Sequence, residues 1–140
     1  MPTASFGYYN AGVEALVEGI NAGSDTWQII LSNTAPDAAD AVQADAAELS
    51  TSGGYTANGN NAAVSTSTQT AGVYKLVLTS PTAWTGAVAG FTARYAILWN
   101  STANKLVGYW DYGSSQVVAA GETFTVTLSG TNGVFTVAKP

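Results

Sequence analysis

FTARYAILWNSTANKLVGYWDY, residues 91–112, carries the clearest structural signal in the chain. Residues 92–99 and 105–112 are rich in the aromatic and β-branched side chains that favour strands. The polar linker NSTAN, residues 100–104, has the composition of a hairpin loop. We therefore predict that these two segments pair as an antiparallel hairpin, with Tyr95, Ile97 and Trp99 on one face.

Short strand patterns of the same kind recur along most of the chain, separated by turns rich in Gly, Asn and Ser. Further strands are predicted over residues 26–32, 63–70, 73–79, 82–88, 116–119, 123–129 and 134–138. The sequence SGTNG, residues 129–133, predicts a second hairpin that pairs residues 123–128 with 134–138. This spacing is typical of an all-β fold, and we expect a jelly-roll-like sandwich of about eight strands. Four large aromatic residues are expected in its core: Trp27, Trp84, Phe124 and Phe135.

The first 25 residues follow a different pattern. The first dozen residues place aromatic side chains among small residues and predict an extended arm. The spacing of Val13, Leu16, Val17 and Ile20 is that of one helical face, which predicts a short helix capped by Asn10 and packed on the sheet. We therefore expect an arm and helix over residues 1–25 and a single β-sandwich domain over residues 26–140.

Residues 37–49, DAADAVQADAAEL, predict a second short helix, or a helical turn within a long connection. Its apolar positions share one face, and Asp37, Asp40, Asp45 and Glu48 share the other. Seven of the nine acidic residues lie between positions 14 and 48, where they form a solvated face or meet a basic partner. The segment lacks the spacing of a calcium-binding loop, so we expect no metal site.

Composition limits the partners that this protein can have. Only 9% of the 140 residues are charged, and the net charge is −5. The four basic residues, Lys75, Arg94, Lys105 and Lys139, are scattered, so we expect neither nucleic acid nor membrane as a partner. The N-terminal sequence lacks a signal-peptide pattern, and no apolar run is long enough to span a membrane. Together with the absence of Cys, this predicts synthesis in a reducing cytoplasm.

The side chains used by most enzymes are missing. The chain has no His and no Cys, which removes the usual general base and the most nucleophilic thiol. The only acids in the strand-rich part are Asp111 and Glu122, and a glycosidase needs two carboxylates across a cleft. We interpret Asp111 as a turn cap and the neighbouring aromatics as strand residues, with sugar binding as an alternative. We expect no catalytic activity, no cofactor and no small-molecule substrate.

The aromatic residues are the best candidates for protein contact, because Tyr and Trp are common anchors of interfaces. Phe6, Tyr8 and Tyr9 lie on the predicted arm, which has no core of its own. Tyr55, in the Gly-rich loop of residues 50–61, completes the set. We predict that these four side chains contact a partner.

Several of these segments together resemble a family of small virion proteins from tailed bacteriophages. The resemblance rests on the Gly-Gly-Tyr loop (residues 53–55), the Arg-Tyr-Ala strand (94–96), the turn Trp-Asp-Tyr-Gly (110–113) and the Thr-rich strand that follows. It extends over residues 26–138 and points in particular to the cement, or decoration, proteins of HK97-type heads.

This resemblance implies a jelly-roll-like homodimer on the outer surface of the virion. Such a protein binds the major capsid protein and bridges its subunits, which stabilises the assembled shell. No catalytic residues come with the family. The alternative is a tail-fibre or receptor-binding module that recognises carbohydrate.

Overall fold

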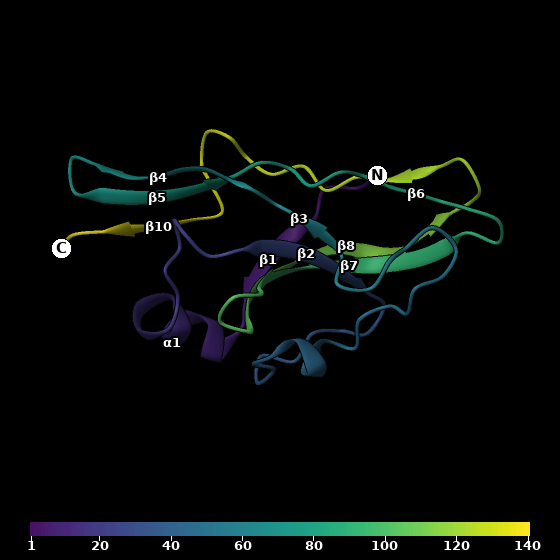
Figure 1. Ribbon diagram of the computed structural model, residues 1–140, viewed down its shortest axis with the longest axis horizontal. Coiled ribbons are helices and arrows are strands. Elements are labelled where there is room, and N and C mark those ends of the chain that lie inside the picture. The colour runs from purple at the N-terminus through teal and green to yellow at the C-terminus, as the bar shows by residue number, and fades with distance from the viewer.

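The computed structural model describes residues 1–140 as two layers of antiparallel strands with a helix and a long loop beneath them (Figure 1). The lower layer is a five-stranded sheet in the order β1 (Ser5–Tyr8), β8 (Lys105–Val118), β7 (Phe91–Asn100), β2 (Trp27–Ser32) and β3 (Asn60–Asn61). The upper layer contains the sheet β10 (Phe135–Ala138), β5 (Val73–Leu78) and β4 (Val64–Thr70), and the pair β6 (Trp84–Thr85) and β9 (Thr123–Phe124). Helix α1 (Asn10–Glu18) and the 3-10 turn η1 (Gln43–Ala46) lie below the five-stranded sheet.

This architecture confirms the prediction of a β-rich sandwich. The sheets have five, three and two strands, whereas a jelly roll is built from eight strands in two sheets. The jelly-roll part of the prediction is therefore not confirmed.

The predicted hairpin of residues 92–112 is the centre of the five-stranded sheet. Strands β7 and β8 are antiparallel, with Asn100 opposite Lys105 and Tyr95 opposite Asp111. Strand β8 continues to Val118, which lies opposite Phe91. Residues 116–118 are therefore the end of one long strand and not the separate strand that we predicted.

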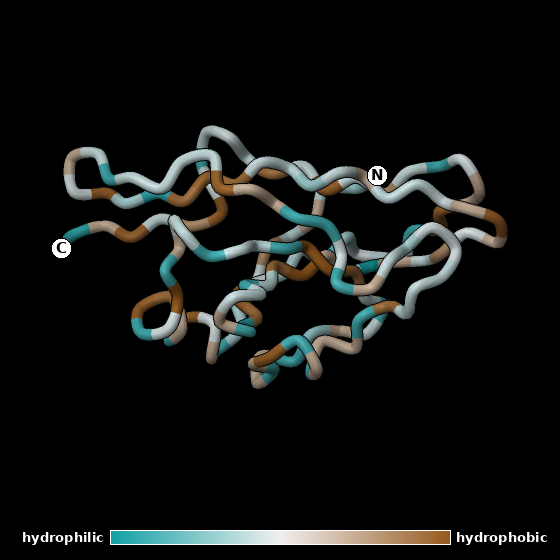
Figure 2. The backbone as a smooth tube through the Cα atoms, viewed as in Figure 1, coloured by the Kyte–Doolittle hydropathy of each residue, from teal (hydrophilic) through white to brown (hydrophobic).

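Both faces of the five-stranded sheet are buried. Between the two layers lies a cluster of 18 buried residues, which includes all four aromatics predicted for the core. On the other face a second cluster joins Tyr95, Ile97 and Trp99 to Tyr9 and to Ala46 of η1. Burial on both sides explains why the hydrophobic colour is concentrated along the central strands in Figure 2.

The predicted pairing of residues 123–128 with 134–138 is wrong. Strand β9 pairs with β6, and β10 pairs with β5, where Phe135 lies opposite Leu76. Gly133 has φ +72, as its Asn-Gly context suggests. However, a Cβ at Gly133 would overlap the Leu76 carbonyl oxygen, so the glycine allows the chain to pass close to β5 instead of turning back on itself.

Of the predicted N-terminal arm and helix, only the helix is found. Residues 10–18 do form a helix, but its buried residues are Gly12 and Ala15, while Val13 and Val17 are 53% and 85% exposed. A Cβ at Gly12 would lie 2.5 Å from the Leu106 carbonyl oxygen, so the helix approaches β8 most closely on its glycine side. Residues 5–8, which we predicted as part of an extended arm, are a strand of the main sheet and pair with β8.

Residues 37–49 form the second of the two structures that we predicted, a helical turn within a long connection, and not a longer helix. Only Gln43–Ala46 make a 3-10 turn. The acidic side chains accept hydrogen bonds from nearby backbone N–H groups instead: Asp37 from Ala39 at 2.9 Å, and Asp45 from Ala41 and Val42 at 3.0 and 3.1 Å. The hydrogen bonds from Ala41 and Val42 lower the pKa of Asp45. Aspartate competes in this way with helical hydrogen bonding, which favours turns.

Candidate interaction surface

The first strand is held at the edge of the sheet by aromatic rings that lie on glycines. The Phe6 ring occupies the space that a Cβ at Gly108 would take, and a Cβ at Gly7 would lie 2.8 Å from the Tyr109 ring. Phe6 also packs on Trp110, with ring centroids 4.9 Å apart. These contacts explain why residues 5–8 form a strand and not a free arm.

The four predicted interface residues have different environments. Tyr9 and Tyr55 are 0% and 1% exposed, so neither side chain reaches the surface of the chain. Tyr8 is 43% exposed and Phe6 is half-buried. Burial, with a smaller effect of Asp40, raises the pKa of Tyr9, whose hydroxyl has no hydrogen-bond partner. Of the predicted set, only Phe6 and Tyr8 remain on the surface.

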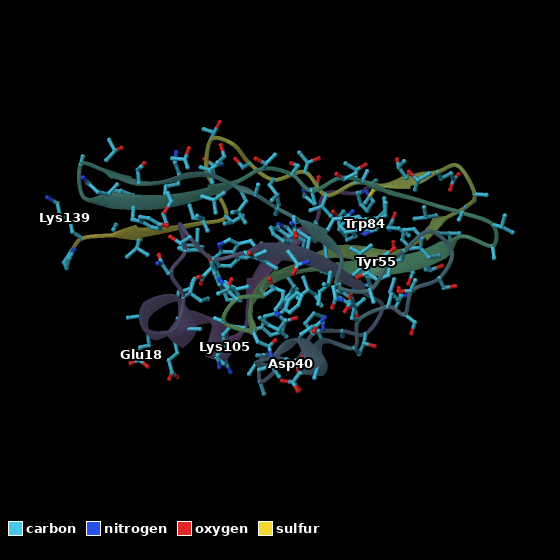
Figure 3. All side chains as sticks on the ribbon, in the orientation of Figure 1. Glu18, Asp40, Tyr55, Trp84, Lys105 and Lys139 are labelled. Atoms are coloured by element: carbon cyan, nitrogen blue, oxygen red, sulfur yellow. The ribbon has the colours of Figure 1, made fainter.

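Tyr55 instead holds the Gly-rich loop of residues 50–61 in place through hydrogen bonds. Its hydroxyl donates to Glu48 Oε1 at 2.5 Å and accepts from the Leu31 backbone N–H at 3.1 Å. Glu48 also accepts from the backbone N–H of Asn58 at 2.6 Å and from Gln43 Nε2 at 2.9 Å. Figure 3 shows Tyr55 pointing into the space between the layers, close to Trp84, and the two ring centroids are 6.2 Å apart.

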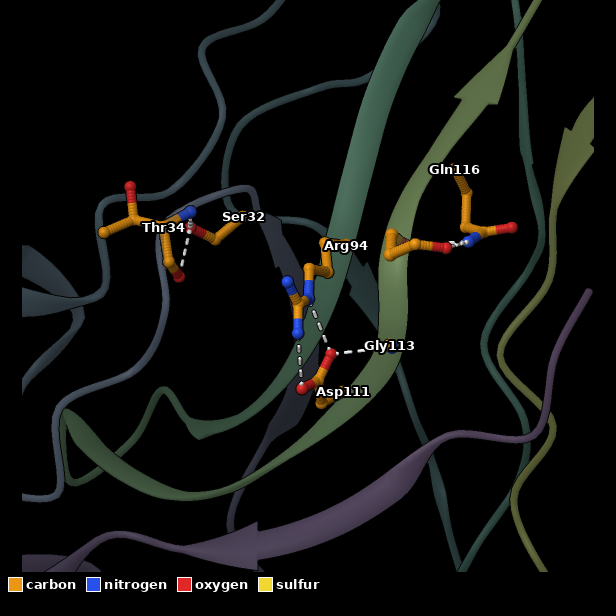
Figure 4. Close-up of polar contacts among 7 residues, drawn as sticks. Ser32, Thr34, Arg94, Asp111, Gly113 and Gln116 are labelled. Atoms are coloured by element: carbon orange, nitrogen blue, oxygen red, sulfur yellow. Dashed lines mark hydrogen bonds and ion pairs between the residues drawn. The ribbon is translucent and has the colours of Figure 1, made fainter.

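An ion pair joins the Arg-Tyr-Ala strand (residues 94–96) to the Trp-Asp-Tyr-Gly turn (residues 110–113). Arg94 of β7 donates from Nε and Nη2 to the two carboxylate oxygens of Asp111, at 2.8 and 3.0 Å (Figure 4). Asp111 also accepts from the Gly113 backbone N–H at 2.8 Å, as a turn cap does. The hydrogen bond from Arg94 is the main reason that the pKa of Asp111 is lowered. Glu122 accepts from the Ala119 backbone N–H at 2.9 Å. Each of these carboxylates is therefore engaged in holding a local turn or strand pair.

A groove runs along the open side of the sandwich where the chain begins. We call it the N-terminal groove; its volume is about 580 Å³, and it is lined by Met1, Pro2, Thr3, Ala4, Trp110, Tyr112, Thr123, Thr125, Val126 and Thr127. None of these ten residues has a charged side chain. A smaller hollow continues past Trp110 and Thr127 to Phe6. The groove thus offers apolar and hydroxyl groups to a partner.

Comparisons with known proteins found no match to the chain among protein-family models, curated proteins or solved structures. No group of acidic side chains is arranged to hold a metal ion. None of the helices is both long enough and apolar enough to span a membrane. The site is therefore interpreted from its own geometry.

Sequence reasoning missed most of the N-terminal groove. The pattern correctly predicts that Trp110 lies on a strand, but it does not indicate that this residue lines a groove. It also places the threonines at 123, 125 and 127 in a hairpin with residues 134–138, which does not form. The alternation of these threonines with Phe124, Val126 and Leu128 was a usable signal, because it predicts one exposed face. The apolar members are indeed buried and the threonines exposed. What lies beside that exposed face depends on tertiary structure.

Proposed function

We propose that this chain is a structural virion protein that binds the outside of a phage head and stabilises the assembled capsid by bridging major capsid protein subunits. The observation that carries the proposal is the N-terminal groove on a β-sandwich, whose lining side chains are all uncharged. The sequence resemblance supports the same assignment. In this proposal the virion surface is the site of action, and the host cytoplasm is the site of synthesis.

The groove suits contact with another folded protein. Its lining of threonine hydroxyls and the partly exposed Trp110 can be buried without removing a charged side chain from water. Tyr8, at the same edge of the sheet, adds an exposed aromatic side chain, and its ring lies 4.9 Å from that of Phe6. Aromatic side chains surrounded by neutral polar groups are typical of protein interfaces.

The proposed mechanism is thermodynamic linkage. A protein that binds only the assembled shell stabilises it in proportion to the occupancy of its sites, and modest contacts add up over many symmetric copies. No covalent step is needed, which agrees with the engagement of Asp111 and Glu122 in local structure.

The test is binding to undecorated phage heads, followed by sedimentation and by thermal rupture of the shell. We expect saturable binding and a raised rupture temperature. Deletion of residues 1–3 and the substitution Thr125→Lys, which places a charge in the groove, are both expected to weaken binding. Thr136→Lys changes an equally exposed threonine on β10, outside the groove, and is the matched control. Binding that is absent, or equal in all variants, would contradict the proposal.

A carbohydrate-binding or receptor-binding module of a tail fibre is the second candidate. It is favoured by one observation: the partly exposed Trp110 lies in the groove beside three threonines, and sugars stack on aromatic rings while bonding to hydroxyls. Binding of host-surface glycans, lost in Thr125→Lys, with no binding to heads would favour this candidate.

A further inference from the structure

The upper layer leaves one long strand edge without a partner. Strand β4 is the outer strand of the sheet β10-β5-β4, so one side of its backbone faces no other strand. It has seven residues, whereas the other outer strands, β1, β3 and β10, have four, two and four. An edge of this length presents a row of N–H and C=O groups that can pair with another chain.

Apart from one irregularity near its start, strand β4 also lacks the features that usually protect an edge. Its sequence, VSTSTQT, contains no charged residue and no proline. The only irregularity in its pairing lies between Val64 and Thr66, so residues 66–70 form a regular ladder with β5. Natural sheets usually guard such edges with charges, prolines or bulges, so this edge is an exception.

The regular part of β4 is self-complementary. It reads Thr66-Ser67-Thr68-Gln69-Thr70, with threonines placed symmetrically around Thr68. These threonines point away from the core, because Ser67 on the opposite face lies 2.8 Å from the Tyr74 hydroxyl, and Tyr74 packs against the core. In an antiparallel pair centred on Thr68, threonine faces threonine at every outward position. Cross-strand threonine pairs stabilise sheets.

We propose that β4 pairs with β4 of a second copy of this chain, antiparallel and around a two-fold axis at Thr68. The two three-stranded sheets then form one continuous sheet of six strands. An interface of this kind is isologous, since the same strand contributes both halves. The inference does not rest on the proposed function, although a dimer would carry two N-terminal grooves.

The charge distribution favours a second copy as the occupant. Although the net charge is −5, no acidic residue occurs between Glu48 and Asp111, a segment that includes the whole of β4 and β5. In Figure 3 Glu18 and Asp40 lie on the side of the molecule opposite the upper layer. Two copies can therefore approach through β4 with their acidic faces turned away from each other.

The size of the contact predicts a weak dimer. A single strand pair buries less than a standard interface, so we expect a dissociation constant on the order of 10–100 μM. Sedimentation equilibrium of the whole chain from about 10 μM to about 1 mM covers this range. A protein that stays monomeric throughout would overturn the proposal.

Substitutions at the two-fold axis test the register. Thr68→Lys places two lysines opposite each other, beside the Lys75 that faces residue 68 within each copy, and is expected to weaken the dimer about fivefold or more. Thr68→Glu also places like charges opposite each other, but Lys75 of the same copy partly neutralises each glutamate, so a smaller weakening is expected. A mixture of the two variants should restore association, because each pair then joins a lysine to a glutamate. Restoration also shows that both variants fold.

Thr136→Lys is the matched control, since Thr136 is an exposed threonine on β10 at the other edge of the same sheet. It is expected to leave the dissociation constant unchanged. A dimer that persists in Thr68→Lys, or variants that do not recover on mixing, would place the interface or its register elsewhere and overturn the proposal.

Discussion

Replacing Gly108 by alanine tests how the first strand is attached to the sandwich. The added methyl group would overlap the Phe6 ring and lie 2.9 Å from the Gly7 backbone oxygen, and Gly108 has no positive φ, so the change acts through the contacts with the first strand. Overfilling a packed site costs about 1–3 kcal/mol of the free energy of unfolding. In a domain of this size that lowers the melting temperature by roughly 3–10 °C.

A double-mutant cycle identifies the contact. Phe6 is half-buried, so Phe6→Ala should cost about 2 kcal/mol, less than a fully buried phenylalanine. In the double variant Gly108→Ala/Phe6→Ala the overlap with the ring is gone and only the close approach to the Gly7 backbone oxygen is left, so the combined cost should be smaller than the sum by about 1 kcal/mol. The measurement is urea unfolding of the two single variants, the double variant and the parent.

Gly130→Ala is the control, because no atom lies within 4 Å of a Cβ at that position. Its free energy of unfolding should stay within about 0.5 kcal/mol of the parent value. Additive costs of the two substitutions, or a neutral Gly108→Ala, would mean that residues 5–8 are a free arm and that the Phe6 ring does not lie on Gly108.

Two further predictions concern the buried tyrosines. Tyr55→Phe leaves the Leu31 backbone N–H without an acceptor, so it should lower the free energy of unfolding in urea by about 1–3 kcal/mol. Tyr8→Phe, at an exposed position, is the control and should leave this free energy unchanged. Equal values for the two variants would contradict a structural role for the Tyr55 hydroxyl. Burial raises the pKa of Tyr9, Tyr55 and Tyr112 above the ordinary value of 10.0. Below pH 10 these groups are neutral in both states, but above it only the unfolded chain releases their protons, so stability should fall by about 1.4 kcal/mol per pH unit for each tyrosine. Ultraviolet titration should show that Tyr9 and Tyr55 ionise only as the protein unfolds, and their ionisation in the folded protein near pH 10 would refute this.

The sequence predicts best where pairing is local. The β7–β8 hairpin is joined by a short turn, and its strands are long, so the pattern defines both the strands and their partner. The strands at the C-terminal end are also visible in the pattern, but their partners are distant in sequence. Alternation predicts that β10 is a strand, but it contains no information that its partner is β5.

The segment of residues 37–49 shows why periodicity alone was insufficient. Its apolar positions fit a helix, yet four of its thirteen residues are acidic. Asp37 and Asp45 bind backbone N–H groups two to four residues away, and such local bonds compete with the helix. Aspartate in a short Ala-rich stretch therefore favours turns over a continuous helix.

The motifs that carry the resemblance make contacts within the chain in this structure. Glu48 bonds to Tyr55, and Arg94 bonds to Asp111, so these residues hold a loop and a strand pair in place. A chain that shares them is expected to share the sandwich, but its surface is free to differ. The proposed contacts lie at other positions, in the N-terminal groove and on the outward threonines of β4. Variation at Thr125 and Thr68, and not at Arg94, is therefore what should separate chains with this fold that bind different partners.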